Sequence, residues 1–487
     1  MLKDSGILVL PNERTLRDYI AAFKSPIGLN ASYLDSVKKD FTCRSNPKEY
    51  DKWVGIIHDE VSIRQELVFD DTGKLIGFVD LGSVQNAIDE LEVLLSSKTS
   101  STLVPEEATH MFVFMVVGLF TEFKMPVCYF PTTTIKSFAL FNVFWKCVEE
   151  LESRDFNVLT STCDGASPHR KFYKFHAPPG TPKGTLIYKT QNPFAEAKRD
   201  LYFICDPVHL LKTTRNNWEN SFWRNKTRKL QNNNMWITWL QLIDAFENDI
   251  NESNASGLRV LHKLKADHLF LNPYLRMRVY LAAQVFSNRV AYAITQQDKP
   301  ETQETAKFVQ HMNDFFDCLN ANRVCTRFEF KSVYRMSNDR RLDWLENTFL
   351  KYFTDWKAWA MGQVHVPIKE RKKYFISDQT WEGLQICVKS FVEVVRFSLN
   401  TIPGVQYVIA TKFNQDPLEK FFGKMRQSRG AYGSFNGQEF AQSYGNLAFR
   451  NSVPIKSIRR LKRSGGQLND LDINIPLEKK HKKANNN

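Results

Sequence analysis

The stretch VGIIHDEVSI at residues 54–63 is a run of mostly β-branched and apolar residues with Asp59 inside it. Its composition predicts a buried strand, and a carboxylate within such a strand must find a partner or reach water. Two shorter runs follow at 67–70 and 75–79. They are joined by a turn whose Gly73 supplies the positive φ that hairpins often need. We therefore expect a sheet to begin here, with Asp59 on its first strand.

The elements that follow have an order typical of one fold. Three more strands and one helix are predicted: strands at 111–120, 156–162 and 201–205, and a helix at 135–151. Asp164 directly follows the second of these strands, and Asp206 follows the third. Three strands expected to be antiparallel, a helix, a strand, an intervening segment and a strand would form a ribonuclease-H-like core. The predicted fold class is therefore α/β, with a ribonuclease-H-like mixed sheet.

Beyond residue 206 the pattern changes to long helical segments. Large apolar residues recur at spacings of three and four in the segments 274–294, 305–319, 341–360 and 381–399. This stretch is long enough to be a large, mostly helical insertion domain. The predicted parts of the chain are a helical lead-in (1–50), the N-terminal part of the ribonuclease-H-like domain (51–206), the helical insertion (207–400), the C-terminal part of the ribonuclease-H-like domain (401–450) and a basic disordered tail (451–487).

Composition indicates a large folded protein with a basic surplus. The chain has 487 residues, 43% of them hydrophobic, and 66 Lys and Arg against 53 Asp and Glu give a net charge of +13. This surplus favours polyanionic partners, and basic clusters at 459–463 and 479–483 could be nuclear-import signals, nonspecific DNA contacts or simply solvated tail. The eight cysteines are spread singly, which indicates neither a disulfide framework nor a structural zinc site. The longest apolar run, 111–120, is about half of a membrane span, so no membrane association is expected.

Three acids lie within or at the ends of elements of the predicted fold. Asp59 lies within the first strand, Asp164 closes the strand after the helix, and Glu419 opens a helix beyond the insertion. The first and fourth strands of this sheet are adjacent, so Asp59 and Asp164 should lie side by side and repel each other. Two Mg²⁺ ions roughly 3.5 to 4 Å apart relieve such repulsion and support phosphoryl transfer. Asp59 and Asp164 are therefore a candidate metal-binding pair, and Glu419 stands out beside them as a third carboxylate, at the start of its helix.

The acids also have structural interpretations. Asp164 precedes a glycine and could only form a turn. The segment Asp416-Pro417-Leu418-Glu419 has the spacing of a capping box, with Asp416 preferred as N-cap and Glu419 able to cap or to ligate.

Basic and aromatic residues of the insertion have structural interpretations as well. Lys212 and Arg215 are by themselves more typical of a solvated basic helix face, and His209 is more typical of a structural hydrogen-bonding group than of a ligand. The tryptophans of the insertion are more typical of a core than of base stacking, namely Trp236, Trp239, Trp356 and Trp359.

Four segments in order resemble the signature blocks of P element transposases and the related THAP-domain transposases. They are HDEVSIRQELVFDDTGKLIGFVDLG (58–82), CDGASPHRKF (163–172), FICDPVHLLKTTRNNW (203–218) and TKFNQDPLEKFFGKMRQSRGAYGS (411–434). The resemblance implies a DDE-type DNA transposase, with Asp59, Asp164 and Glu419 as the metal-binding catalytic acids. It further implies an insertion that binds GTP, with Asp206, Lys212 and Asp267 as candidate cofactor contacts. The residues alone do not predict GTP, because no G-x-x-x-x-G-K-[ST] loop is present.

The resemblance also has gaps. These transposases carry an N-terminal zinc-bearing THAP domain, whereas only Cys43 falls within the first hundred residues here. We therefore expect a catalytic region without that domain. The first hypothesis is a nuclear, DNA-binding transposase that is a homo-oligomer when active. The alternatives are a catalytically inactive, transposon-derived protein that binds DNA or nucleotide, and a nuclease acting on RNA in hybrids.

Overall fold

The computed structural model describes most of the chain. The described residues are 12, 14, 27–45, 48–69, 73, 75–82, 85–88, 106–221, 227–297, 299–324, 326, 328–428 and 434–452. The basic clusters at 459–463 and 479–483 lie outside them, as do much of the predicted lead-in and most of the 71–74 turn.

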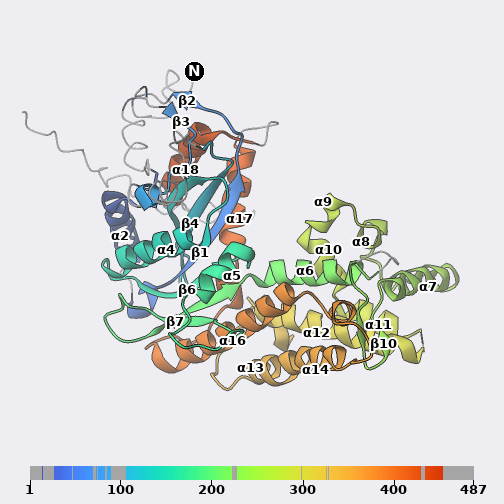
Figure 1. The fold of residues 1–487 in the computed structure, drawn as a ribbon. Helices are drawn as coiled ribbons and strands as arrows, with labels where there is room; N and C mark the ends of the chain where they lie inside the picture. Colours follow the sequence, from blue (N-terminus) through green and yellow to red (C-terminus); the bar gives the residue numbers. More distant parts are fainter. Residues whose placement is uncertain are drawn as a thin grey trace, which may run out of the picture.

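A six-stranded mixed sheet forms the centre of the first lobe (Figure 1). Its strand order is β5-β4-β1-β6-β8-β7. The strands are β1 (Trp53–Ser62), β4 (His110–Gly118), β5 (Lys124–Thr132), β6 (Asn157–Cys163), β7 (Lys189–Gln191) and β8 (Asp200–Cys205). β1, β4 and β5 pair antiparallel, whereas β6 runs parallel to β1 and β8 runs parallel to β6. The predicted fold class is therefore confirmed.

The identity of the three antiparallel strands differs from the sequence prediction. The runs at 67–70 and 75–79 form only a separate hairpin of β2 (Val68–Phe69) and β3 (Leu75–Ile76). The third strand of the sheet is instead β5, which contains Pro126 and Pro131. Proline cannot donate to a strand ladder and is tolerated at edges, which is where β5 lies. Its two prolines therefore hid this strand in the sequence.

Helices cover both faces of the sheet. Side chains of α2 (Ala31–Ser45), α4 (Ser137–Glu152) and α5 (Ser167–Lys174) pack with Val54 and Ile56 of β1. Side chains of α17 (Asp416–Gln427) and α18 (Gly437–Ser452) pack with Ile57 and Val61. Because successive strand residues point to opposite faces, Asp59 shares the α17 face with Ile57 and Val61.

The second lobe is mostly helical (Figure 1). Its helices are α6 (Pro207–Glu219), α7 (Leu240–Ser256), α8 (Ala266–Leu269), α9 (Pro273–Arg276), α10 (Val279–Val285), α11 (Asn288–Thr295), α12 (Gln303–Leu319), α13 (Arg340–Asp343), α14 (Leu350–Met361), α15 (Ile368–Arg371) and α16 (Asp378–Thr401). Shorter elements are β9 (Gln231–Asn232), β10 (Met235–Trp236) and the turns η1 (Glu49–Lys52), η2 (Pro300–Thr302), η3 (Glu329–Lys331), η4 (Trp344–Phe349, a π-helix) and η5 (Ala410–Phe413).

The single helix predicted over 274–294 is in fact three. One break comes at Phe286, whose buried ring stacks on Trp218 with the ring centres 5.8 Å apart. Packing of this ring therefore outweighs the helical spacing of its neighbours. Trp239 and Trp356 are core residues as predicted, while Trp236 is 45% exposed.

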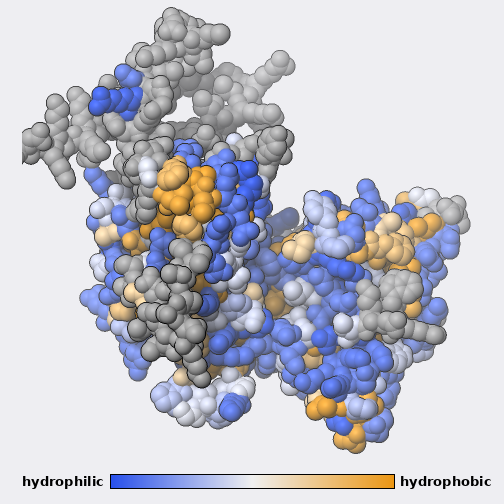
Figure 2. All heavy atoms as spheres, turned by 45° about the horizontal axis from the view of Figure 1, so that its top comes forward, coloured by the Kyte–Doolittle hydropathy of each residue, from blue (hydrophilic) through white to orange (hydrophobic). Residues whose placement is uncertain are grey.

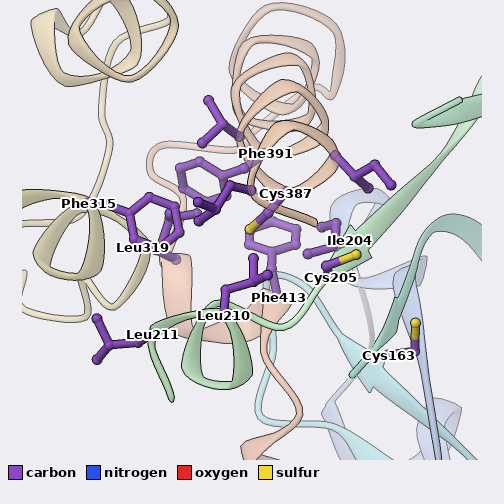
Figure 3. Close-up of a cluster of buried hydrophobic side chains, with 14 of the residues drawn as sticks. Cys163, Ile204, Cys205, Leu210, Leu211, Phe315, Leu319, Cys387, Phe391 and Phe413 are labelled. Carbon is purple, nitrogen blue, oxygen red and sulfur yellow. The ribbon is translucent and has the colours of Figure 1, made fainter. Parts of the chain in front are cut away.

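The two lobes share one continuous core where α16 returns to the sheet. Figure 3 shows Cys387 and Phe391 of α16 beside Cys205 of β8, Leu210 of α6 and Phe413 of η5. In space-filling view the lobes are joined below and separated above, and the coloured part of the face shown is mostly hydrophilic (Figure 2). Among the described residues, no helix combines the length and apolar character that crossing a bilayer requires.

Candidate active site

The parallel pairing of β1 with β6 brings the first two acids together. Ile57 pairs with Thr162, so the end of β6, and Asp164 just beyond it, lies beside Asp59. Asp59 Oδ1 accepts a hydrogen bond from the backbone amide of Glu60 at 2.8 Å. The adjacency expected from the sequence is therefore present in the structure.

Asp164 forms the turn that follows β6. It also belongs to a group of four acids, called here the acid cluster: Asp59, Asp164, Asp206 and Glu419. Its Oδ1 accepts hydrogen bonds from the Ala166 amide and is 2.8 Å from Nδ1 of buried His169. Gly165 follows with φ +72°, and a Cβ there would lie 3.0 Å from Cys205 Sγ. The turn interpretation of Asp164 is thus correct for one oxygen, while its side chain stays 29% exposed.

The pKa values of Asp59 and Asp164 are shifted in opposite directions. Burial, reinforced by the negative charge of Asp164, raises the pKa of Asp59 to about 6. Burial also acts to raise the pKa of Asp164, but the hydrogen bond and charge of His169 outweigh it and hold that pKa well below its usual range. Asp164 is therefore ionised at neutral pH with a partner of its own, whereas the protein gives Asp59 no comparable compensation.

Glu419 lies in the first turn of α17 and does not cap it. The N-cap is Gln415, with Pro417 in the first turn, so the prediction that Asp416 is the N-cap is wrong by one residue. The side chain of Glu419 is 44% exposed, and its Oε1 lies 3.9 Å from His209 Nε2. Burial and the charges of Asp206 and Asp416 raise the pKa of Glu419, against the opposing charges of His209 and Lys212.

Asp206 connects the beginning of α6 to the beginning of α17. Its Oδ2 accepts from the backbone amide of His209 and lies 2.8 Å from His209 Nδ1, while its Oδ1 accepts from the amide of Gln415 at 3.0 Å. The residue is 1% exposed. Burial acts to lower the pKa of His209, but the bond to Asp206 outweighs it and raises that pKa. Asp206 therefore orients His209 and Gln415, and both of its oxygens are occupied.

Lys212 and Arg215 are not a solvated basic face; that interpretation is wrong. Burial lowers the pKa of Lys212, although the charges of Asp59, Asp164, Asp206 and Glu419 all act to raise it. Arg215 is fully buried and donates to the carbonyl of Arg276 at 2.8 Å. Lys212 thus lies within the combined field of four carboxylates.

Asp267 is not part of this cluster. It is exposed in the first turn of α8, within the helical lobe. None of the hydrogen bonds or charge interactions described for the acid cluster involves it. The nucleotide contact predicted for Asp267 therefore stays a prediction.

The donor set fits a hard divalent cation. Within the described part of the chain, Asp59 Oδ2, Asp164 Oδ2 and both oxygens of Glu419 carry no hydrogen bond. Magnesium prefers carboxylate oxygens, and a cation between the acids would offset both the burial and the charge of Asp164 that raise the pKa of Asp59. Cys163, Asp164 and His169 also offer donor atoms within 4.8 Å of one another, but thiolate and imidazole suit softer metals.

Comparison with known proteins now decides the family. Residues 26–176 match the family described as TNP-like, RNase H N-terminal domain, and residues 208–332 match TNP-like, GTP-binding insertion domain. The Transposable element P transposase of Drosophila melanogaster is 24% identical over 356 residues, which are 71% of this chain. This chain belongs to the P element-like transposase family. It spans 42% of the length of that relative.

A solved structure shows the same fold. The Drosophila P element transposase strand transfer complex matches this member of the family with a TM-score of 0.67 and 20% identity, over 91% of this chain and 86% of that one. Because the likeness covers 91% of this chain, it extends over both the mixed sheet and the helical lobe.

Proposed function

We propose that this chain is the catalytic region of a DDE-type DNA transposase, which hydrolyses DNA phosphodiesters and transfers strands in a Mg²⁺-dependent reaction. The observation that supports it is the convergence of Asp59, Asp164 and Glu419 around His209 and Lys212, from segments far apart in the sequence. The relative of known structure is described as a strand transfer complex, and that chemistry is extended to this chain here.

The acids would hold the metal ions in distinct roles. Asp59 would contact two Mg²⁺ ions, Asp164 one of them and Glu419 the other. Magnesium ions held by these acids would supply the activation of an attacking oxygen and the stabilisation of the leaving oxygen in an in-line phosphoryl displacement. His169 keeps Asp164 ionised, and Asp206 keeps the Nε2 edge of His209 toward Glu419.

Lys212 would contact a phosphate. It is buried and within electrostatic range of Asp59, Asp164, Asp206 and Glu419, so it would place a positive charge beside a phosphodiester or nucleotide bound at these acids. The family description of the insertion supports GTP as a further ligand, with Lys212 as a candidate phosphate contact, Asp267 as a candidate guanine contact and Asp206 at the entrance to the insertion. A nuclear location and a homo-oligomeric active form complete the proposal.

The test replaces each of the three acids in turn and measures DNA cleavage and DNA affinity separately. Asp59→Asn, Asp164→Asn and Glu419→Gln should each reduce DNA cleavage in Mg²⁺ by at least 10²-fold, because each removes a metal ligand and leaves phosphate contacts in place. DNA affinity, measured by fluorescence anisotropy in EDTA, should change little. Asp416→Asn is the matched control, because this acid lies one turn before Lys420, pairs with it, and shares α17 with Glu419.

The substrate arms distinguish the rival functions. Cleavage of duplex DNA in Mg²⁺, and none in EDTA, would support the transposase. Binding of DNA without cleavage by the wild type would indicate an inactive, transposon-derived binding protein. Preferential cleavage of RNA in a hybrid would indicate a ribonuclease. Equal cleavage by wild type and Asp59→Asn would reject the site itself.

A further inference from the structure

Glu419 is far in sequence from the sheet that holds the other two acids. The whole helical insertion lies between β8 and α17, and among the described residues the N-cap of α17 makes no side-chain capping hydrogen bond. The first turn of a helix carries unpaired amides and frays unless something fixes it. Something other than a cap must therefore hold Glu419 in place.

The side chain of Gln415 makes a hydrogen bond to the β1 backbone just past the end of the β1–β6 pairing. The last pair between β1 and β6 is Ile57 with Thr162, so the next carbonyl of β1, that of His58, lies beyond the last pair of this ladder. Gln415 Nε2 donates to this carbonyl at 3.1 Å, and Gln415 is 1% exposed. The contact attaches the beginning of α17 directly to the residue that precedes Asp59.

The backbone of Gln415 completes the connection. Its amide donates to Asp206 Oδ1 at 3.0 Å, and its carbonyl accepts from the amides of Leu418 and Glu419, each at 3.0 Å. The other oxygen of Asp206 holds His209, whose Nε2 faces Glu419. A short series of hydrogen bonds thus runs from the backbone beside Asp59 to the backbone of Glu419, and His209, held by Asp206, lies 3.9 Å from the Glu419 carboxylate.

We propose that Asp206 and Gln415 are a pair of positioning residues that set Glu419 in register with Asp59 and Asp164. This inference rests on the proposed function, because it concerns the third ligand of the same metal site. Neither residue touches substrate or metal in this scheme. Their effect is to keep the first turn of α17 fixed relative to β1, across the junction that the insertion creates.

The main test is Gln415→Met, which keeps the side-chain volume and removes the donor to His58. It also removes Gln415 Oε1, a buried acceptor without a partner among the described residues, so the variant should fold. Binding of Mn²⁺ to the DNA-free protein is measured by electron paramagnetic resonance. We expect two ions in the wild type and a 10- to 100-fold weaker second ion in the variant, as is typical when support for a metal ligand is lost.

Gln85→Met is the matched control. Gln85 is also buried, at 4% exposed, and its Oε1 accepts from Asn142 at 2.8 Å. This variant should match Gln415→Met in circular dichroism and keep wild-type Mn²⁺ affinity. Equal Mn²⁺ affinity in wild type and Gln415→Met, or an equal loss in Gln85→Met, would overturn the proposal. A wild type that binds no Mn²⁺ would overturn the proposed function as well, so the two failures are distinguishable.

Asp206→Asn tests the other member of the pair. The side chain of Asn has one accepting oxygen, and its nitrogen can only donate. It therefore cannot accept the hydrogen bonds of both Gln415 and His209, one at each end of the side chain. We expect weakened binding of the same ion, and a double variant with Gln415→Met no weaker than the more affected single variant. Losses that multiply in the double variant would show that the two residues act independently. That outcome would refute the pair, and it needs no activity measurement.

Discussion

Replacing Asp59 with Asn removes the negative charge of this side chain and keeps its size. The Asn amide oxygen can keep the 2.8 Å hydrogen bond from the Glu60 amide. Burial and the charge of Asp164 raise the pKa of Asp59 from 3.8 to about 6. A tenfold change in proton affinity corresponds to about 1.4 kcal/mol, so ionised Asp59 destabilises the metal-free fold by up to about 3 kcal/mol. We expect Asp59→Asn to raise the free energy of unfolding by up to that amount at pH 8 in EDTA.

The pH dependence fixes the sign of this effect. Between pH 3.8 and pH 6 the folded protein keeps the proton on Asp59 that the unfolded chain releases, so wild-type stability falls as pH rises through this range. The advantage of the variant should shrink from about 3 kcal/mol at pH 8 to about 1.6 kcal/mol at pH 5.

Urea denaturation in EDTA, followed by tryptophan fluorescence, measures the difference at both values. A variant no more stable than wild type at pH 8 would refute the reasoning, as would an advantage that does not shrink at pH 5. Saturating Mg²⁺ should reverse the order, because the wild type then gains the free energy of ion binding.

Three further predictions concern packing, the partner of Asp164 and the ion. Gly383→Ala should destabilise the fold by about 1–3 kcal/mol in thermal or urea melts, because the new Cβ would lie 2.6 Å from Leu210 Cδ2. Gly423→Ala, on the open face of α17, should instead stabilise by about 0.5–1 kcal/mol. His169→Asn removes the group that lowers the pKa of Asp164, so the acidic limb of the cleavage pH profile should move to higher pH; an unmoved limb would contradict this assignment. Adding Mg²⁺ to metal-free protein should raise the melting temperature of the wild type but not of the catalytic-acid variants.

The fold was largely predictable where local pattern and topology agree. The apolar run containing Asp59 became β1, and the segment before Asp164 became β6, because β-branched runs of this length suit a buried strand. The choice of neighbours was not predictable from pattern alone. The 67–79 runs form a good hairpin locally, yet β4 pairs with proline-containing β5 instead. Which strands pair depends on interactions across the whole sheet. A short stretch of sequence does not contain that information.

The site was predictable only in part. Strand order placed Asp59 beside Asp164, but Glu419 entered through its place in a resembling block, since its spacing fits a cap equally well. Lys212 was misjudged because helical spacing reveals neither its burial nor the charges of the four acids that act on it. Gln415 has no sequence signal of its own. Only the D-x-x-H spacing of Asp206 and His209, one helical turn apart, could have indicated their contact.

The charges of the site indicate where a cation would have its largest effect. Asp164 has His169 as a partner, Asp206 has His209, and Glu419 is half-exposed, where water can solvate it. Asp59 is partly buried and has no ion-pair partner among the described residues, and burial together with the charge of Asp164 raises its pKa to about 6. Without metal, a proton competes for this oxygen as pH falls toward 6. A divalent ion that displaces the proton removes the repulsion from Asp164 at the same time, so its affinity should weaken steeply below pH 6 and level off above it. This is the behaviour expected of the acid shared by both ions, and a Mn²⁺ affinity independent of pH between 5 and 8 would assign that role to another residue.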